Sequence, residues 1–164
     1  MSRMLGNNTL ERSIELRDQN GNLVVSEVGS SAIKLFSPDK KLIARFGFDA
    51  FFIGFIAKLN DGSLALGVIC SEVVGGLRNS NQARISDVVV VSLDKIRREV
   101  NPDSSGTYYR VSSDYTNRLQ ATPEQLNQLL GLHQQASEKQ LFCSSQQIAD
   151  VADVLKKNNH RARF

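Results

Sequence analysis

Apolar and polar residues alternate along roughly the first hundred positions of the chain, and short turn-forming sequences interrupt this alternation at close intervals. A period of two residues is typical of antiparallel strands that bury one face. The turn sequences include Asn20-Gly21, which tolerates the positive φ of a tight hairpin, and Ser37-Pro38. This pattern predicts strands over residues 10–16, 23–28, 33–36, 42–48, 51–59, 64–70, 85–93 and 107–112.

Two of these segments lack a polar face. Residues 51–59 alternate between two sets that are both largely apolar, and residues 88–91 are four consecutive valines. A strand that is apolar on both faces is expected to be buried on both sides. We therefore expect 51–59 to be a central strand, and 85–93 to be a buried strand that continues into a short helical or extended piece over 95–98.

The apolar period changes to about 3.6 residues in the last third of the chain, which indicates helices. Thr122-Pro123-Glu124-Gln125 combines an N-cap hydroxyl, proline at the first helical position and glutamine three residues after the cap, so it predicts a helix start. Ser144 and Gln147 have the same spacing and precede an amphipathic repeat. We expect this second helix to end near Lys157, where lysines suit the negative end of the helix dipole.

Together these elements predict an α+β fold. We expect an antiparallel β-rich sandwich or partly open barrel of roughly seven or eight strands, followed by two C-terminal helices. The expected division of the chain is a β-rich body over 1–119, a two-helix segment packed on it over 120–157, and a solvated basic tail over 158–164. The tail is expected to be dispensable for folding because no apolar period continues beyond Leu155.

The composition is that of a globular chain. Its 164 residues are 41% hydrophobic and 23% charged, which excludes an intrinsically disordered or fibrous protein. The longest apolar run, 50–57, is far shorter than the roughly 20 residues that a membrane-spanning helix needs. The polar N-terminus contains no apolar segment of a cleavable signal. We expect a cytoplasmic protein without a membrane span, and export through an uncleaved signal is left open.

The basic isoelectric point, near 9.0, comes from the end of the chain. The formal net charge is +3, and it would be −1 without four cations of the last nine residues: Lys156, Lys157, Arg161 and Arg163. The basic character therefore does not by itself indicate a nucleic-acid-binding face on the folded body.

Residues with catalytic or metal-binding chemistry are few. The two cysteines, Cys70 and Cys143, have no ligand spacing, and the two histidines, His133 and His160, are isolated, so we expect no metal and no cofactor. A hydrolase that combines either cysteine with a histidine and Asp150 can be written down, but no motif for a nucleophile supports it. A small hydrolase with a dispersed site is our third hypothesis.

Six of the eight phenylalanines lie between residues 36 and 55, and Arg45-Phe46-Gly47-Phe48 has the basic and aromatic composition of strands that stack nucleic-acid bases. A phenylalanine-rich core explains the same residues, and we favour it. The alternative hypothesis is a single-stranded nucleic-acid-binding protein that uses this sheet and the basic tail. Its candidate residues are Arg45, Phe46, Phe48, Lys156, Lys157, Arg161 and Arg163.

The three tyrosines lie within eight residues, near two arginines. Tyrosine and arginine dominate binding hot spots because they combine a large contact area with polar groups. In a strand over 107–112, alternation places Tyr109 and Val111 in the core and leaves Tyr108 and Arg110 in solvent. The candidate partner-binding residues are Tyr108, Arg110, Tyr115 and Arg118.

The preferred hypothesis is a non-catalytic protein–protein interaction or adaptor module. It would present the tyrosine–arginine segment and a long loop over 72–83, and its partner would be another protein. This hypothesis is preferred because no set of residues has the spacing that acid–base, nucleophilic, metal or phosphate chemistry requires. The sequence leaves the identity of the partner and the oligomeric state open.

Overall fold

The structure, a computed structural model, describes residues 13–27, 29–49, 51–69, 84–134 and 145–162. Within these residues the predicted α+β fold is confirmed: two β-sheets and several helices, without a closed barrel. The strands are β2 (Ser13–Arg17), β3 (Leu23–Glu27), β4 (Ala32–Phe36), β5 (Leu42–Phe48), β6 (Phe52–Lys58), β7 (Leu64–Ile69), β8 (Ile85–Val91) and β9 (Tyr108–Val111). The helices are α2 (Leu93–Glu99), α3 (Ser113–Thr116), α4 (Pro123–Gln134) and α5 (Ser145–Ala162).

The larger sheet has five strands in the order β2-β3-β4-β5-β9. Strands β2 to β5 form an antiparallel meander, whereas β9 pairs with β5 in parallel. The alternation predicted antiparallel pairing, and this one pair of the sheet is parallel instead. The chain leaves β5, builds the second sheet and α2, and returns to the free edge of β5 in the same direction, which a parallel pairing requires.

The smaller sheet has three strands in the order β6-β7-β8. Strand β6 is buried on both faces as predicted, but it lies at the end of this sheet and not at its centre. Its edge is bonded to the chain before β4: Gly29 N donates to Ile53 O, and Ile53 N donates to Ser30 O, each at 2.8 Å. The outer edge of β8 is also hydrogen-bonded: Val90 N donates to Leu119 O at 2.8 Å, and Ala121 N donates to Val88 O at 3.0 Å.

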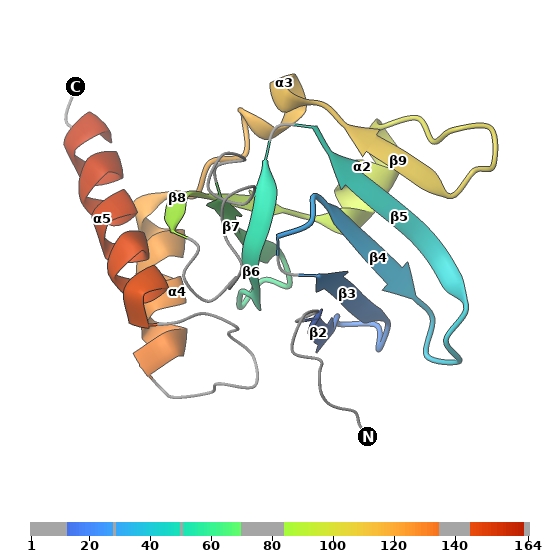
Figure 1. The fold of residues 1–164 in the computed structure, drawn as a ribbon, viewed down its shortest axis with the longest axis horizontal. Helices are drawn as coiled ribbons and strands as arrows, with labels where there is room; N and C mark the ends of the chain where they lie inside the picture. The colour runs from blue at the N-terminus through green and yellow to red at the C-terminus, as the bar shows by residue number, and fades with distance from the viewer. Residues whose placement is uncertain (1–12, 28, 50, 70–83, 135–144, 163–164) are drawn as a thin grey trace.

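Two hydrophobic cores lie on either side of the smaller sheet. The first fills the space between the five-stranded sheet, the smaller sheet and α2, and it includes Phe46, Ile53 and Ile96. The second lies between the smaller sheet and the pair α4 and α5, and it includes Phe55, Leu126 and Val151. Figure 1 shows the resulting order, with the helix pair at one end, the smaller sheet in the middle and the larger sheet at the other end.

The start of α4 confirms the predicted capping box. Gln125 N donates to Thr122 Oγ1 at 3.1 Å, and Thr122 N donates to Gln125 Oε1 at 2.9 Å. This reciprocal pair satisfies two backbone donors that the first turn of a helix leaves free. The other predicted box, at Ser144, lies outside the described residues.

Two predicted boundaries are wrong. The strand expected over 85–93 ends at Val91, because Ser92 caps α2 by accepting from Lys95 N at 3.3 Å. The last helix does not end near Lys157 but continues to Ala162. Asn158 Nδ2 donates to Ala121 O at 3.0 Å, so the start of the expected tail is helical and bonded to the body.

Two glycines offer a test of this packing. A methyl group on Gly54 in β6 would lie 2.8 Å from side-chain atoms of Ile69 and Ile85, whereas one on Gly131 in α4 would meet nothing within 4 Å. We expect Gly54→Ala to lower the free energy of unfolding by about 1 to 3 kcal/mol through overpacking. Gly131→Ala should raise it by about 0.5 to 1 kcal/mol because alanine favours a helix. Urea unfolding of both variants measures this, and a neutral Gly54→Ala would contradict the packing.

Candidate functional site

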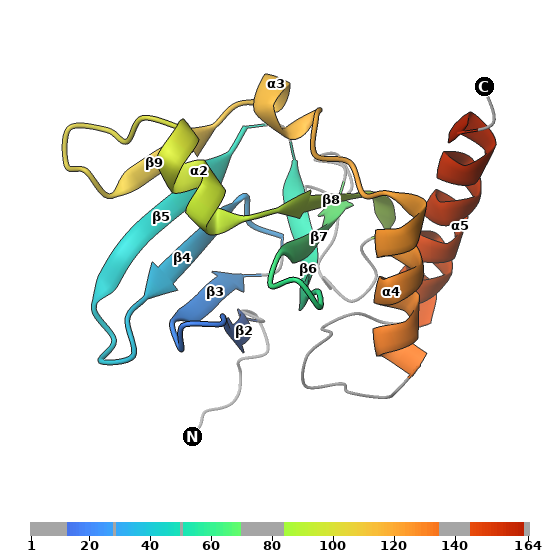
Figure 2. The same ribbon diagram turned by 180° about the vertical axis from the view of Figure 1, so that it is seen from behind.

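One face of the five-stranded sheet packs on the first core, and we call the opposite face the outer face. On the core side, Val24, Ile33, Ala44 and Tyr109 are buried. Helix α2 lies on the same side, in front of β5 and β9 in Figure 2 and behind them in Figure 1. No described helix or strand covers the outer face.

The strand registers arrange the outer face in rows. One row crosses all five strands, and we call it the central row: Glu15, Val25, Lys34, Arg45 and Tyr108. A second row lies next to the central row on the same face, and we call it the apolar row. It consists of Leu23, Phe36 and Leu42, with Arg17 at its end on β2. Leu42 is 47% exposed, and Lys34 and Arg45 are also exposed. Basic and apolar side chains thus lie side by side on an open surface.

Arg45, Tyr108 and Gly47 form a compact unit on β5 and β9. The Arg45 guanidinium carbon lies 4.7 Å from the centre of the Tyr108 ring, which is a cation–π contact. The tip of this ring lies over Gly47, where a Cβ atom would collide with the tyrosine hydroxyl. The glycine in the Arg45-Phe46-Gly47-Phe48 sequence therefore makes room for the ring of the neighbouring strand.

Arg110 extends this unit along β9. Its Nε lies 3.0 and 3.1 Å from the two carboxylate oxygens of Asp49, and its side chain is largely exposed. The hydrogen bond to Asp49 and the negative charge of Asp49 raise the pKa of Arg110. Because the pair is solvated, it orients the guanidinium more than it stabilises the fold.

The predicted faces of this strand are confirmed, since Tyr109 and Val111 are buried while Tyr108 is half-buried and Arg110 exposed. The set of four candidate residues does not form one surface, however. Tyr115 lies in α3 and packs on the first core, where its hydroxyl donates to Glu99 Oε1 of α2 at 2.7 Å.

Tyr115 and Arg118 form a second cluster on the side of α2. The guanidinium carbon of Arg118 lies 5.6 Å from the centre of the Tyr115 ring. Burial, the hydrogen bond to Glu99 and the charge of Glu99 raise the pKa of Tyr115 to about 12. The shared sequence segment is thus divided between two sides of the sheet, because the chain turns at Ser112, which caps α3.

The phenylalanines proposed for base stacking lie in the core. Phe46 and Phe48 are 0% and 3% exposed, and their rings stack on Tyr109 and Phe51. The sheet surface that the nucleic-acid hypothesis required from these two rings is therefore not present. Of the cations in that hypothesis, Arg45 is exposed on the outer face, whereas Lys156 and Lys157 are exposed on α5.

Helix α5 lies beyond the smaller sheet, at the other end of the molecule from the outer face (Figure 1). Arg45 therefore does not share a surface with Lys156 and Lys157. The side chain of Arg161 is not described, and Arg163 lies outside the described residues, as does the predicted loop over 72–83.

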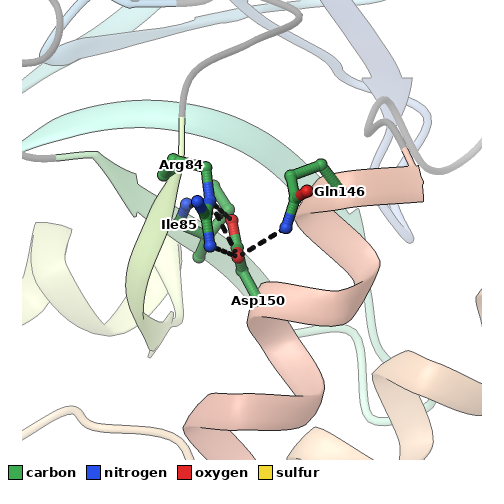
Figure 3. Close-up of polar contacts among 4 residues, drawn as sticks. All are labelled: Arg84, Ile85, Gln146 and Asp150. Atoms are coloured by element: carbon green, nitrogen blue, oxygen red, sulfur yellow. Dashed lines mark hydrogen bonds and ion pairs between the residues drawn. The ribbon is translucent and has the colours of Figure 1, made fainter.

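An ion pair between the buried Asp150 and Arg84, whose side chain is exposed, holds α5 against the start of β8 (Figure 3). Asp150 is 3% exposed, and its carboxylate accepts hydrogen bonds from Arg84 Nη2 at 2.7 Å and from Arg84 Nε at 3.0 Å. Ile85 N also donates to it at 2.9 Å, and Gln146 Nε2 donates at 3.3 Å. Burial by itself would raise the pKa of Asp150, but these donors outweigh it and hold the pKa below its usual value of 3.8.

This arrangement gives Asp150 a structural role. The hydrolase hypothesis used Asp150 beside a cysteine and a histidine, but its oxygens are occupied by Arg84, Ile85 and Gln146. Cys70 and Cys143 lie outside the described residues, and the side chains of His133 and His160 are not described. Within the described part of the chain, no three His, Cys, Asp or Glu side chains converge in a way that could hold a metal ion.

No described helix is long and apolar enough to cross a membrane. No protein-family model matches the chain, and neither curated proteins nor solved structures provide a match. The function is therefore inferred from the geometry of the described residues.

Sequence reasoning missed the basic and apolar rows of the outer face. The alternation of Ile33 and Leu35 with Lys34 and Phe36 is visible in the sequence and assigns the last two to the solvent side. Their alignment with Arg45 and Leu42 depends on the register between β4 and β5, which includes a bulge at Leu35 and Phe36. The sequence contains no pattern that predicts the pairing of Arg84 with Asp150, since 66 positions separate the two residues.

The Arg84–Asp150 pair predicts a pH dependence. Because the pKa of Asp150 is lowered on folding, the charged carboxylate contributes stability above about pH 4, and this contribution is lost as the pH falls through the folded-state pKa. We expect Asp150→Asn to lower the free energy of unfolding at pH 7 by about 1 to 3 kcal/mol. The variant should also lose less stability than wild type on acidification below pH 4.

Chemical unfolding at several pH values measures both effects. Glu124→Gln serves as the control, because Glu124 is an exposed carboxylate on the neighbouring helix α4. If both variants lose the same amount of unfolding free energy, Asp150 does not specifically hold α5 on the body.

Proposed function

We propose that this protein is a non-catalytic protein-binding module, and that its outer face takes up an acidic, partly apolar segment of a partner protein. The proposal is supported by the rows of side chains on that face. It keeps Tyr108 and Arg110 as partner-binding residues and adds Lys34, Arg45 and Leu42 from the neighbouring strands.

The observation that carries the proposal is the position of two cations. Lys34 and Arg45 are directly opposite each other on β4 and β5, and both are exposed. Like charges that are opposite across two strands destabilise a sheet. Neither residue forms an ion pair within the described part of the chain. A negatively charged partner would offset this repulsion between Lys34 and Arg45. Binding would therefore recover the free energy that the repulsion costs the folded sheet.

The surrounding charges favour the same type of partner. Among the residues whose side chains are described, the outer face carries the cations Arg17, Lys34, Arg45 and Arg110 and the acidic residues Glu15 and Asp49. Glu27 falls on the same face by its register on β3, and its side chain is not described. Asp49 is already paired with Arg110, and Glu15 lies on β2, three strands away from Arg45. Among the described side chains, the centre of the face therefore carries more positive than negative charge, which attracts an acidic segment.

The apolar row favours a protein over a nucleic acid. Leu42 is 47% exposed beside the half-buried Phe36, so a partner that covers the row gains apolar contacts. The face of Tyr108 that a base could stack on already meets the Arg45 guanidinium. A peptide with carboxylates near Lys34 and an aliphatic side chain near Leu42 complements both features.

The test uses peptides selected from a random display library on the wild-type protein. We expect the selected peptides to be acidic and to contain aliphatic residues. Replacing both Lys34 and Arg45 by glutamine should weaken their binding by at least about tenfold, because each charged hydrogen bond contributes roughly 1.5 to 3 kcal/mol. Fluorescence anisotropy at physiological salt measures the affinity, and thermal melts verify that the variants fold.

The matched control replaces two exposed lysines elsewhere, Lys95 and Lys156, and should bind the peptides like wild type. Peptides that bind the Lys34 and Arg45 variant equally well would refute the proposal. Tight binding of a single-stranded oligonucleotide that this variant loses would instead favour the nucleic-acid alternative. We expect no oligonucleotide binding at physiological salt.

A further inference from the structure

A second candidate site lies on the other side of the sheet, between α2 and β9. It is an open cavity of about 310 Å³ lined by Asp94, Arg97, Arg98 and Tyr109. This volume is at the lower end of the range for sites that bind small molecules. The cavity shares no residue with the outer face, so it is independent of the proposed protein-binding function.

The helix places three charged residues at this cavity. Asp94, Arg97 and Arg98 are spaced i, i+3 and i+4, which puts them on one side of α2. Leu93 and Ile96 are buried and anchor the helix on the core. Neither arginine forms an ion pair with any residue in the described ranges, even though Asp94 has the spacing for one. Both guanidinium groups are therefore free to bind an anion.

Tyr109 supplies an independent observation that points to a ligand. It is only 7% exposed, and its ring stacks on Phe46 at 5.4 Å between ring centres. Buried tyrosine hydroxyls usually have a hydrogen-bond partner. The hydroxyl of Tyr109 has none among the described residues, whereas that of Tyr115 donates to Glu99. Tyr109 also lines the cavity, so the side chain that carries this hydroxyl borders the site.

We propose that this cavity binds a small phosphorylated polyol of the sugar-phosphate class. The Arg97 and Arg98 guanidinium groups bind the phosphate oxygens, for which their planar donor geometry is suited. The Tyr109 hydroxyl donates to a further phosphate oxygen. Two guanidinium groups and a hydroxyl match the three free oxygens of a phosphate ester better than the two oxygens of a carboxylate.

Asp94 determines which phosphate compounds fit. Its carboxylate is an acceptor only, so it binds a hydroxyl group of the ligand and repels additional negative charge. The polyol part of a sugar phosphate supplies such hydroxyls. A free inorganic phosphate lacks them, so it should bind more weakly than a sugar phosphate.

Isothermal titration calorimetry with three probes tests the proposal: ribose 5-phosphate, glucose 6-phosphate and glycerol 3-phosphate. We expect at least one to bind the full chain at millimolar concentration or below, and more tightly than inorganic phosphate or unphosphorylated ribose. The absence of binding for all three would overturn the proposal. Equal affinity for inorganic phosphate would overturn the role of Asp94 and the sugar-phosphate class.

Variants then assign the binding to the cavity. Tyr109→Phe and Arg97→Gln should each weaken binding of the best probe by about tenfold or more. Lys95→Gln is the control, because Lys95 is an exposed cation on the same helix that does not line the cavity. Its affinity should equal that of wild type, and a loss as large as that of Arg97→Gln would show a non-specific effect of charge.

Tyr109→Phe also separates binding from folding. The hydroxyl has no partner within the described part of the chain, so its removal should leave the melting temperature unchanged or slightly higher. Lost binding with an unchanged melting temperature supports the site. Unchanged binding in Tyr109→Phe would overturn the proposal. These outcomes do not depend on Lys34 or Arg45, so this test and that of the outer face can fail separately.

Discussion

The burial of both faces of β6 is the constraint on which the rest of the structure depends. Ile53 and Ile56 belong to the first core, whereas Phe55 and Ala57 belong to the second. Strands β7 and β8 likewise contribute to both cores, so the smaller sheet separates them and holds the larger sheet and the helix pair in one molecule. Because the first core uses only one face of the larger sheet, no described element covers the opposite face.

Local features of this fold could be predicted from the sequence, because they depend on neighbouring residues alone. Alternation assigned Tyr109 to the core and Arg110 to solvent, and the spacing of Thr122 and Gln125 predicted the start of α4. The end position of β6 and the parallel pairing of β9 were not predictable in this way. Both depend on which strands meet in space, and alternation carries no information about pairing partners.

The candidate sites show the same division between local and distant information. Alternation shows that Lys34 is exposed, but only the register of β4 on β5 shows that it is opposite Arg45. The spacing of Asp94, Arg97 and Arg98 is visible in the sequence, whereas the buried tyrosine that completes their cavity comes from a later strand. Clusters of this kind are assembled by the fold, so they have no motif that a linear search would detect.

The parallel addition of β9 also affects the order in which the molecule folds. Strands β2 to β5 are consecutive and pair through short loops, but Arg45 meets Tyr108 only after about sixty further residues have been made. During synthesis the edge of β5 is therefore unpaired and open to association with other chains. The Arg45–Tyr108 contact and the Asp49–Arg110 pair both cross this last junction. A nascent or truncated chain that lacks β9 would have neither contact, so the complete outer face arises only when the sheet is closed at this edge.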